Sequence, residues 1–196
     1  MMNVIYILFS YLMGAISFGI VMSRLFSLPD PRTIGSKNPG ATNVLRTGKK
    51  LAALLTLLGD ALKGSLTVGL AQYFELSPLM VALVAIATLL GHIFPVYYGF
   101  IGGKGVATAA GILFMFSWMM GCTVLAIWFA VFIIWRYSSL AAIIAASLSP
   151  VMGFFYAIDF YQLIASSIIA LILILRHIDN IKRLINGTES SFREKK

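Results

Sequence analysis

Ionisable residues are scarce in this chain, and their scarcity excludes most soluble folds. Only 11% of the 196 residues are charged, 60% are hydrophobic, and the mean hydropathy is +0.93. A typical soluble domain is about 25% charged. A soluble core of this size could not bury so much apolar surface, so the solvent must be lipid. The sequence therefore predicts an all-α, polytopic membrane helix bundle that forms a single domain over residues 1–196.

Cysteine, histidine and acidic motifs are also nearly absent. The single Cys122 allows neither an internal disulfide nor a cysteine-based metal site. Neither His92 nor His177 is followed five residues later by aspartate, so the His-x-x-x-x-Asp arrangement of the large glycerolipid acyltransferase families is missing. The acidic residues form no multi-aspartate motif, and no Gly-x-Ser-x-Gly nucleophile elbow occurs. We predict no metal site and no cofactor.

Positive charge is in excess, and its distribution predicts the topology. A net charge of +8 would suggest nucleic acid in a soluble protein. Here it fits cytoplasmic loops enriched in Lys and Arg, so we predict no nucleic acid partner. No obligate protein partner is evident. No cleavable signal peptide is evident either, and the first apolar run reads as a retained span. The expected spans are 3–24, 51–74, 79–98, 105–120, 121–136, 140–157 and 160–176.

The number of predicted transmembrane helices depends on whether the apolar stretch 105–136 forms one helix or two. As one helix it would be roughly 48 Å long, which is too long for one crossing unless strongly tilted. Only Gly121 hints at a break. Splitting the stretch keeps Arg136 and the basic tail on the side of the other basic loops, in agreement with the positive-inside rule. The sequence therefore predicts about seven transmembrane helices, with the N-terminus outside and the C-terminus in the cytoplasm. Residues 188–196 look like a flexible tail.

Two polar loops have the composition of anion-binding sites. Residues 35–46, GSKNPGATNVLR, combine small residues with neutral donors and with Arg46, which can bind a phosphate through two hydrogen bonds. The sequence Gly102-Gly103-Lys104-Gly105 directly precedes a predicted helix, whose N-terminus can bind phosphate. Its spacing is not that of a Walker A loop. An ordinary lipid-contacting loop and a tight inter-span connection are the alternatives.

Two further polar segments and one intramembrane pair complete the inventory. Arg136-Tyr137-Ser138-Ser139-Leu140 reads alone as a basic anchor with a helix cap. On the segment 176–189, helical spacing brings Arg176, Asn180 and Arg183 together, although a surface amphipathic helix would look similar. Asp60 and Lys63 lie three residues apart inside a span, where ionisable groups are costly and usually paired. Their role, structural or functional, is open at this point.

These runs resemble a known family. GSKNPGATNVLR, GHIFP followed by GGKGVAT, RYSSL, RHIDNIKRLINGTE and Asp60-x-x-Lys63-Gly64 occur in the order found in the bacterial acyl-phosphate:glycerol-3-phosphate acyltransferases. The resemblance spans nearly the whole chain. Lys37 and Pro39 fill variable positions of the first motif, and the family's Arg-x-x-Ser-Leu pattern favours Ser139 over Ser138.

The resemblance implies an activity and a location. A fatty acyl group would pass from acyl phosphate to the sn-1 hydroxyl of glycerol 3-phosphate, giving lysophosphatidic acid and phosphate. The expected partners are these two substrates and membrane lipid, at the cytoplasmic face of the bacterial inner membrane. We expect direct transfer without an acyl-enzyme, because acyl phosphate is already activated and no nucleophile motif is present.

Two sets of residues are predicted to form the site. Catalytic roles are predicted for Lys104, Ser139, His177 and Asn180. Substrate or phosphate binding is predicted for Ser36, Asn38, Gly40, Ala41, Thr42, Asn43, Arg46, Gly102, Gly103, Gly105, Arg136 and Arg183. The sequence alone leaves open whether His177 acts as a base or a donor, and which loop holds which phosphate. The competing functions are a transporter of small phosphate-bearing anions and a lipid-binding scaffold.

Overall fold

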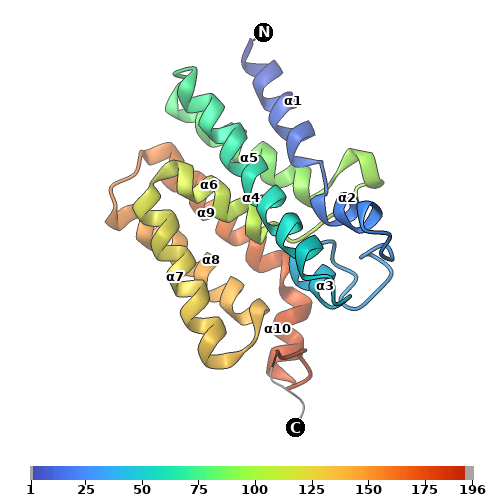
Figure 1. Ribbon diagram of the computed structural model, residues 1–196. Helices are drawn as coiled ribbons and strands as arrows, with labels where there is room; N and C mark the ends of the chain where they lie inside the picture. Colours follow the sequence, from blue (N-terminus) through green and yellow to red (C-terminus); the bar gives the residue numbers. More distant parts are fainter. Residues whose placement is uncertain (1, 193–196) are drawn as a thin grey trace.

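The computed structural model describes residues 2–192, and these residues form helices and loops with no strand among them (Figure 1). The helices are α1 (Met2–Gly14), α2 (Phe18–Leu25), α3 (Ala41–Leu45), α4 (Lys50–Tyr73), α5 (Pro78–Ile93), the 3-10 turn η1 (Val96–Tyr98), α6 (Val106–Phe116), α7 (Trp118–Trp135), α8 (Ser138–Phe155), α9 (Phe160–Arg176) and α10 (Ile178–Ile185).

The described helices supply four to six membrane crossings by length and composition. Four spans suffice alone: α4, α5 with η1, α7 and α8. Helices α1 and α2 form a pair bent by 43°, and α9 and α10 a pair bent by 56°. Helix α6 has 11 residues, or about 16 Å, roughly half of a ~30 Å hydrocarbon core. The predicted all-α membrane bundle is confirmed, and each of the seven predicted spans contains a helix, but α6 is too short to cross unaided.

The break inside the long apolar stretch lies at Ser117 rather than at Gly121, which corrects the sequence prediction. Ser117 has an extended backbone, and its hydroxyl caps α7 by accepting a hydrogen bond from the Met120 amide. Gly121 lies one turn inside α7, where a Cβ atom would approach the Phe114 ring to 2.5 Å. Its role is therefore close helix packing rather than helix termination.

Close backbone contacts hold the centre of the bundle together. Helix α5 packs against α1, α4 and α9. A Cβ on Gly14 or Gly91 would lie 2.1 Å from a carbonyl oxygen across the α1–α5 contact, and Gly64 and Gly111 serve the α4–α6 contact in the same way. Lipid tails are as apolar as leucine, so helices in a membrane associate by close packing and polar contacts. The Thr88 hydroxyl adds such a contact by donating to Thr67, at 2.8 Å.

Helices α6, α7, α8 and α9 form a second, ring-like group. Each packs on the next, and α9 closes the ring by contacting α6. The ring joins the first group of helices through α4–α6 and α5–α9 contacts. The loop before α6 and the start of α8 therefore face the same space, which is where the polar motifs gather.

The start of α1 and the end of α10 lie at opposite ends of the bundle in Figure 1. The segment 188–192 departs from the predicted flexible tail, because it packs on the bundle. The Phe192 amide donates to the carbonyl of Arg136 at 2.9 Å, and its ring lies against Phe132. The remainder of the predicted tail, 193–196, lies outside the described residues.

The predicted orientation can be tested by cysteine labelling in a Cys122→Ala background. Single cysteines near the polar end should react with a membrane-impermeant maleimide only from the cytoplasmic side: Lys37→Cys, Lys104→Cys, Ser138→Cys and Lys182→Cys. The exposed Tyr73, at the far end of α4, is the matched control and should react as Tyr73→Cys only from outside. Labelling of any polar-end cysteine exclusively from outside would contradict the topology.

Candidate functional site

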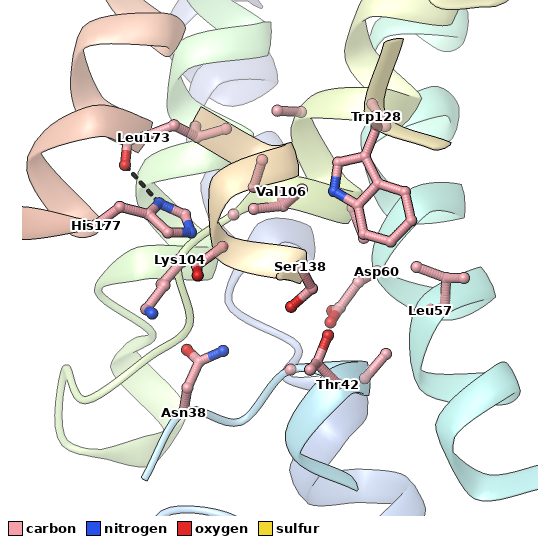
Figure 2. Close-up of a pocket in the computed structure, with 18 of the residues that line it drawn as sticks. Asn38, Thr42, Leu57, Asp60, Lys104, Val106, Trp128, Ser138, Leu173 and His177 are labelled. Carbon is pink, nitrogen blue, oxygen red and sulfur yellow. Dashed lines mark hydrogen bonds between the residues drawn. The ribbon is translucent and has the colours of Figure 1, made fainter. Parts of the chain in front are cut away.

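A cavity of about 750 Å³ occupies the polar end of the bundle and extends into its apolar interior. Its polar wall comes from loop 35–46, from Lys104, and from α10 with the segment after it. Its apolar wall includes Leu57, Leu113 and Trp128. In Figure 2, Asn38 and Thr42 face Lys104, His177 and Ser138 across this space. One cavity therefore joins a charged end to a hydrocarbon-like end.

The side chain of Asn43 holds loop 35–46 in its conformation through hydrogen bonds to the backbone of this loop and of the segment before it. Its side-chain oxygen accepts from the Ser36 amide at 3.0 Å, and its side-chain nitrogen donates to the carbonyls of Pro31 and Ile34. Asn43 is buried, so these bonds occupy its amide group. The fold of the loop leaves Ser36 and Arg46 lining the cavity, while Asn43 supports them from behind.

The glycine loop before α6 is shaped by its contact with His92. A Cβ on Gly103 would lie 2.1 Å from the His92 ring, and one on Gly102 would lie 2.2 Å from the His92 carbonyl oxygen. The Gly103 amide donates to that carbonyl, and Arg176 donates to the Gly103 carbonyl at 3.3 Å. Gly105, with φ of 90°, turns the chain into α6. The free amides of the first helical turn and the Lys104 amine thus face one space.

A chain of hydrogen bonds with a fixed direction runs through the polar end. Lys104 Nζ donates to Asn180 Oδ1, and Asn180 Nδ2 donates to Glu189 Oε1 at 2.7 Å. Ser139 Oγ donates to the same Glu189 oxygen at 2.7 Å, and Arg183 Nε donates to the other at 2.7 Å. An ammonium can only donate and a carboxylate can only accept. The Asn180 amide orientation is therefore determined, and the lone pairs of Ser139 are left to accept from a ligand.

His177 lies at the junction of α9 and α10, and one of its two ring nitrogens is engaged in a hydrogen bond. Its Nδ1 is 2.7 Å from the Leu173 carbonyl oxygen, the contact drawn as a dashed line in Figure 2. Because a carbonyl can only accept, Nδ1 carries the proton. The neutral ring then has Nε2 available as an acceptor, and the His177 ring lines the cavity.

The electrostatics of the polar end favour an anion. Burial lowers the pKa of Lys104 to about 8, an effect that the charge of Glu189 only partly offsets. Burial raises the pKa of Glu189, but hydrogen bonds from Ser139, Asn180 and Arg183 outweigh it and hold the pKa below its usual range. Glu189 is therefore ionised at neutral pH. Besides it, the cavity wall contains one carboxylate, Asp60, against several cations: Lys37, Arg46, Lys50, Lys104 and Arg183.

Asp60 belongs to a buried ionic cluster that lies beneath the glycine loop. Lys63 Nζ lies 2.9 Å from Asp60 Oδ1, and His92 Nδ1 lies 3.5 Å from the same oxygen. Lys63 also donates to the Ile16 carbonyl in the break between α1 and α2, at 2.7 Å. The Thr108 hydroxyl contacts His92 Nδ1 at 3.2 Å. The cluster therefore connects the α1–α2 break, α4, α5 and α6 with the loop that carries Lys104.

Comparison with known proteins assigns the chain to a family. The family model described as glycerol-3-phosphate acyltransferase matches residues 4–187. The chain is 52% identical over 195 residues to the glycerol-3-phosphate acyltransferase of Methylobacillus flagellatus, with both chains covered in full. It is 55% identical over 188 residues to that of Nitrosospira multiformis, covering 94% of this chain and 93% of the relative. The chain belongs to the glycerol-3-phosphate acyltransferase family.

Solved structures agree with this glycerol-3-phosphate acyltransferase assignment. The crystal structure of PlsY (YgiH), an integral membrane glycerol 3-phosphate acyltransferase, in its glycerol 3-phosphate form, matches with a TM-score of 0.94 and 36% identity. Its lysophosphatidic acid form matches with a TM-score of 0.92 and 34% identity. Both matches cover 98% of this chain and 96% of the other. The chain is accordingly a multi-pass membrane protein.

Most residues predicted for the acyltransferase site line the one cavity. They are Lys104, Ser139, His177, Asn180, Ser36, Asn38, Gly40, Ala41, Thr42, Arg46, Gly105 and Arg183. Four do not line it. Asn43 orders its own loop, and Gly102 and Gly103 make room for His92, as described above. Arg136 ends α7 in the left-handed region, exposed, with its carbonyl bonded to Phe192.

The sequence interpretation left Glu189, which lines the cavity, out of the acyltransferase site. Glu189 was assigned to the flexible tail. The sequence pattern that could have located it is the Asn186-Gly187 pair after α10, which is typical of a helix end. Gly187 has φ of 69°, its amide donates to the Leu184 carbonyl, and the next amide donates to the Arg183 carbonyl. This helix-ending turn reverses the chain. Glu189 is thereby placed beside Ser139.

We predict that Asp60→Asn strongly destabilises this acyltransferase. Removing one partner of a buried ion pair leaves an uncompensated charge, at a cost of about 3–5 kcal/mol. The double variant Asp60→Asn with Lys63→Met removes both charges and should recover most of the loss. Thermal unfolding in detergent measures both variants. An Asp60→Asn protein as stable as the wild type would show that the Asp60–Lys63 ion pair does not contribute to the stability of the fold.

Proposed function

We propose that the chain transfers a fatty acyl group from acyl phosphate to the sn-1 hydroxyl of glycerol 3-phosphate at the cytoplasmic face of the bacterial inner membrane. The products are lysophosphatidic acid and inorganic phosphate. The observation that carries this proposal is the continuity of the cavity: the cationic end suits a phosphate dianion, and the apolar end suits a fatty chain.

The lipid-soluble substrate has a route from the membrane. Leu57 on α4 and Phe129 on α7 line the cavity, and their exposed fractions are 47% and 51%. Both helices are spans, so these exposed side chains contact lipid. We infer that acyl phosphate enters between α4 and α7, while glycerol 3-phosphate enters from water at the polar end.

The fixed direction of the hydrogen bonds supports separate roles for the polar side chains. Ser139 donates to Glu189 and so accepts from the attacking hydroxyl. His177 Nε2 and the second Asn180 N–H orient the rest of the glycerol. Lys104, Arg46 and the amides at the start of α6 bind phosphate oxygens and stabilise the charge that develops in the transition state.

The proposed step needs no enzyme nucleophile. The sn-1 oxygen attacks the carbonyl carbon of acyl phosphate, and the bond between that carbon and the phosphate oxygen breaks. Before attack the hydroxyl donates a hydrogen bond to Ser139 Oγ. As the new bond forms, the hydroxyl turns and its proton passes to a phosphate oxygen, since phosphate has a second pKa near 6. Positioning and electrostatic stabilisation supply the acceleration, because the mixed anhydride is already activated.

The arrangement of possible nucleophiles supports direct transfer. Among residues 2–192, neither histidine is hydrogen-bonded to a serine, and Cys122 is exposed and outside the cavity wall. Ser139 is bonded to a carboxylate whose lowered pKa makes it a weak base. In the same residues no three of His, Cys, Asp and Glu come together. We accordingly propose a reaction without a metal ion.

A transporter of phosphate-bearing anions is the weaker alternative. Such a protein needs a polar path from one membrane face to the other. Here the charged groups lie at one end of the cavity. The other end is lined by apolar residues such as Val124 and Ile169 and by Ser149, whose hydroxyl is bonded to the Ala146 carbonyl of its own helix. A lipid-binding scaffold would account for the cavity but would form no product.

We expect purified protein in lipid nanodiscs to convert defined acyl phosphate and glycerol 3-phosphate into lysophosphatidic acid and phosphate in equal amounts. EDTA should not abolish this conversion. Without the acceptor, quenching with labelled acyl phosphate should leave the protein unmodified on intact mass spectrometry. A stoichiometric acylated serine or cysteine, removed by glycerol 3-phosphate, would contradict direct transfer. Absence of any product would contradict the function.

We predict that Lys104→Ala and Arg46→Ala lower activity about ten- to a hundredfold. Each loses a charge-assisted hydrogen bond to phosphate, a loss of ~1.5–3 kcal/mol. Lys49→Ala is the control, because Lys49 is exposed and does not line the cavity, whereas Lys50 does. Steady-state rates in nanodiscs measure the effect. Equal losses in all three variants would indicate nonspecific attraction to lipid headgroups.

The pKa of Lys104 predicts an alkaline limit to the reaction. Lys104 is cationic below pH 8 and neutral above it, so kcat/KM for glycerol 3-phosphate should fall as the pH rises through about 8. The substrate is already a dianion in that range. Arginine stays charged, so the Lys104→Arg variant should lose this fall in kcat/KM at alkaline pH, whatever the absolute rate of the variant. If the fall in kcat/KM at alkaline pH persists unchanged in Lys104→Arg, a group other than Lys104 causes it.

A further inference from the structure

The cavity continues from the polar end into the ring of α6, α7, α8 and α9 because small side chains line it there. On α8 the residues that face the cavity above Ser139 are Ala142, Ala145, Ala146 and Ser149. Alanines of α6 and α9 line the same space. From Ser139 to Ser149 this passage, here called the inner channel, is about 15 Å long along the helix axis.

The inner channel ends at a packed layer. One turn beyond its last lining residues lie Phe116 on α6, Met120 on α7 and Gly153 on α8, none of which lines the cavity. Met120 is fully buried and Phe116 is 8% exposed. A Cβ on Gly153 would lie 2.9 Å from the Ile158 side chain and in ordinary contact, at 3.4 Å, with the Met120 methyl, so the side chains around Gly153 are closely packed. The channel is therefore closed at the end opposite to the charged residues.

We propose that the inner channel holds the acyl chain of the donor and that its closed end limits chain length. The inference rests on the proposed function and adds to it the determinant of acyl selectivity. With the acyl phosphate group held near Lys104 and Ser139, the chain runs past Ala146 and Ser149, and its terminal methyl group lies against Met120.

The physical basis of selection in this channel is steric rather than hydrophobic. A chain that moves from the bilayer into the channel exchanges one apolar environment for another, so burial itself favours no length. A chain longer than the channel must displace packed side chains, which is unfavourable in a closely packed core. Activity should therefore fall steeply for chains that are too long and only gradually for chains that are too short.

The rival path for the chain leads sideways into the bilayer. Leu54 and Leu57 on α4 and Leu125 and Phe129 on α7 flank this opening. A chain that lay there would extend into lipid and meet no end wall. It would show no upper length limit, and residues of the inner channel would not affect selectivity. The two paths therefore make opposite predictions.

The test compares dodecanoyl, palmitoyl and stearoyl phosphate as donors for the full-length protein in nanodiscs. Ala146→Leu adds bulk inside the channel and should lower kcat/KM for the palmitoyl donor about tenfold relative to the dodecanoyl donor. Ser147→Leu adds bulk to the neighbouring exposed position on α8 and should leave that ratio unchanged. Met120→Ala opens the closed end and should raise the use of stearoyl relative to palmitoyl phosphate.

The outcomes separate this inference from the function on which it rests. Normal transfer with a selectivity that neither Ala146→Leu nor Met120→Ala changes would overturn the inner channel and favour the sideways path. Equal losses for every donor in Ala146→Leu would also overturn it. If Ala146→Leu does not fold, the shift in Met120→Ala decides alone. Wild-type protein that transfers from no donor would overturn the proposed function and this inference together.

Discussion

The carboxylate of Glu189 and the ammonium of Lys104 set the direction of the hydrogen bonds that join Lys104, Asn180, Glu189 and Ser139. Between an acceptor that cannot donate and a donor that cannot accept, the Asn180 amide has one possible orientation, and Ser139 must donate toward Glu189. Three segments distant in sequence are joined in this way: the glycine loop, α10 and the start of α8. The groups left over are an accepting oxygen on Ser139 and donors on Lys104, which match a hydroxyl and a phosphate.

Membrane packing holds these segments in place. Lipid provides no hydrophobic force between helices, so the helices associate by close packing. Glycines allow this packing because they let the helix backbones approach each other. The Asp60, Lys63 and His92 cluster then connects this packing to the site, since His92 lies directly under Gly103. The cost of ionisable groups at this depth is offset by their pairing. Helix packing, ionic cluster and glycine loop thus form one continuous support for Lys104.

The sequence predicted the membrane class, the helical segments and most of the cavity wall, because hydropathy, loop charge and glycine-rich motifs are local signals. It could not place Glu189, whose role depends on a chain reversal at Gly187 and on contact with a helix fifty residues earlier. Asn43, Gly102 and Gly103 have residue types that suit anion binding and loop support equally. Ser117 and Gly121 show the same limit, because by residue type either could lie at a helix break. In the fold Ser117 caps α7, whereas Gly121 packs closely against Phe114.

The most direct test of this account is the steady-state kinetics of Glu189→Gln. Glutamine has nearly the same shape, but its amide can both donate and accept, so the direction of the hydrogen bonds is no longer imposed. The account predicts a kcat/KM for glycerol 3-phosphate lowered about ten- to a hundredfold. The KM for acyl phosphate and the unfolding temperature should change little. A Glu189→Gln enzyme with wild-type kinetics for glycerol 3-phosphate would contradict the account.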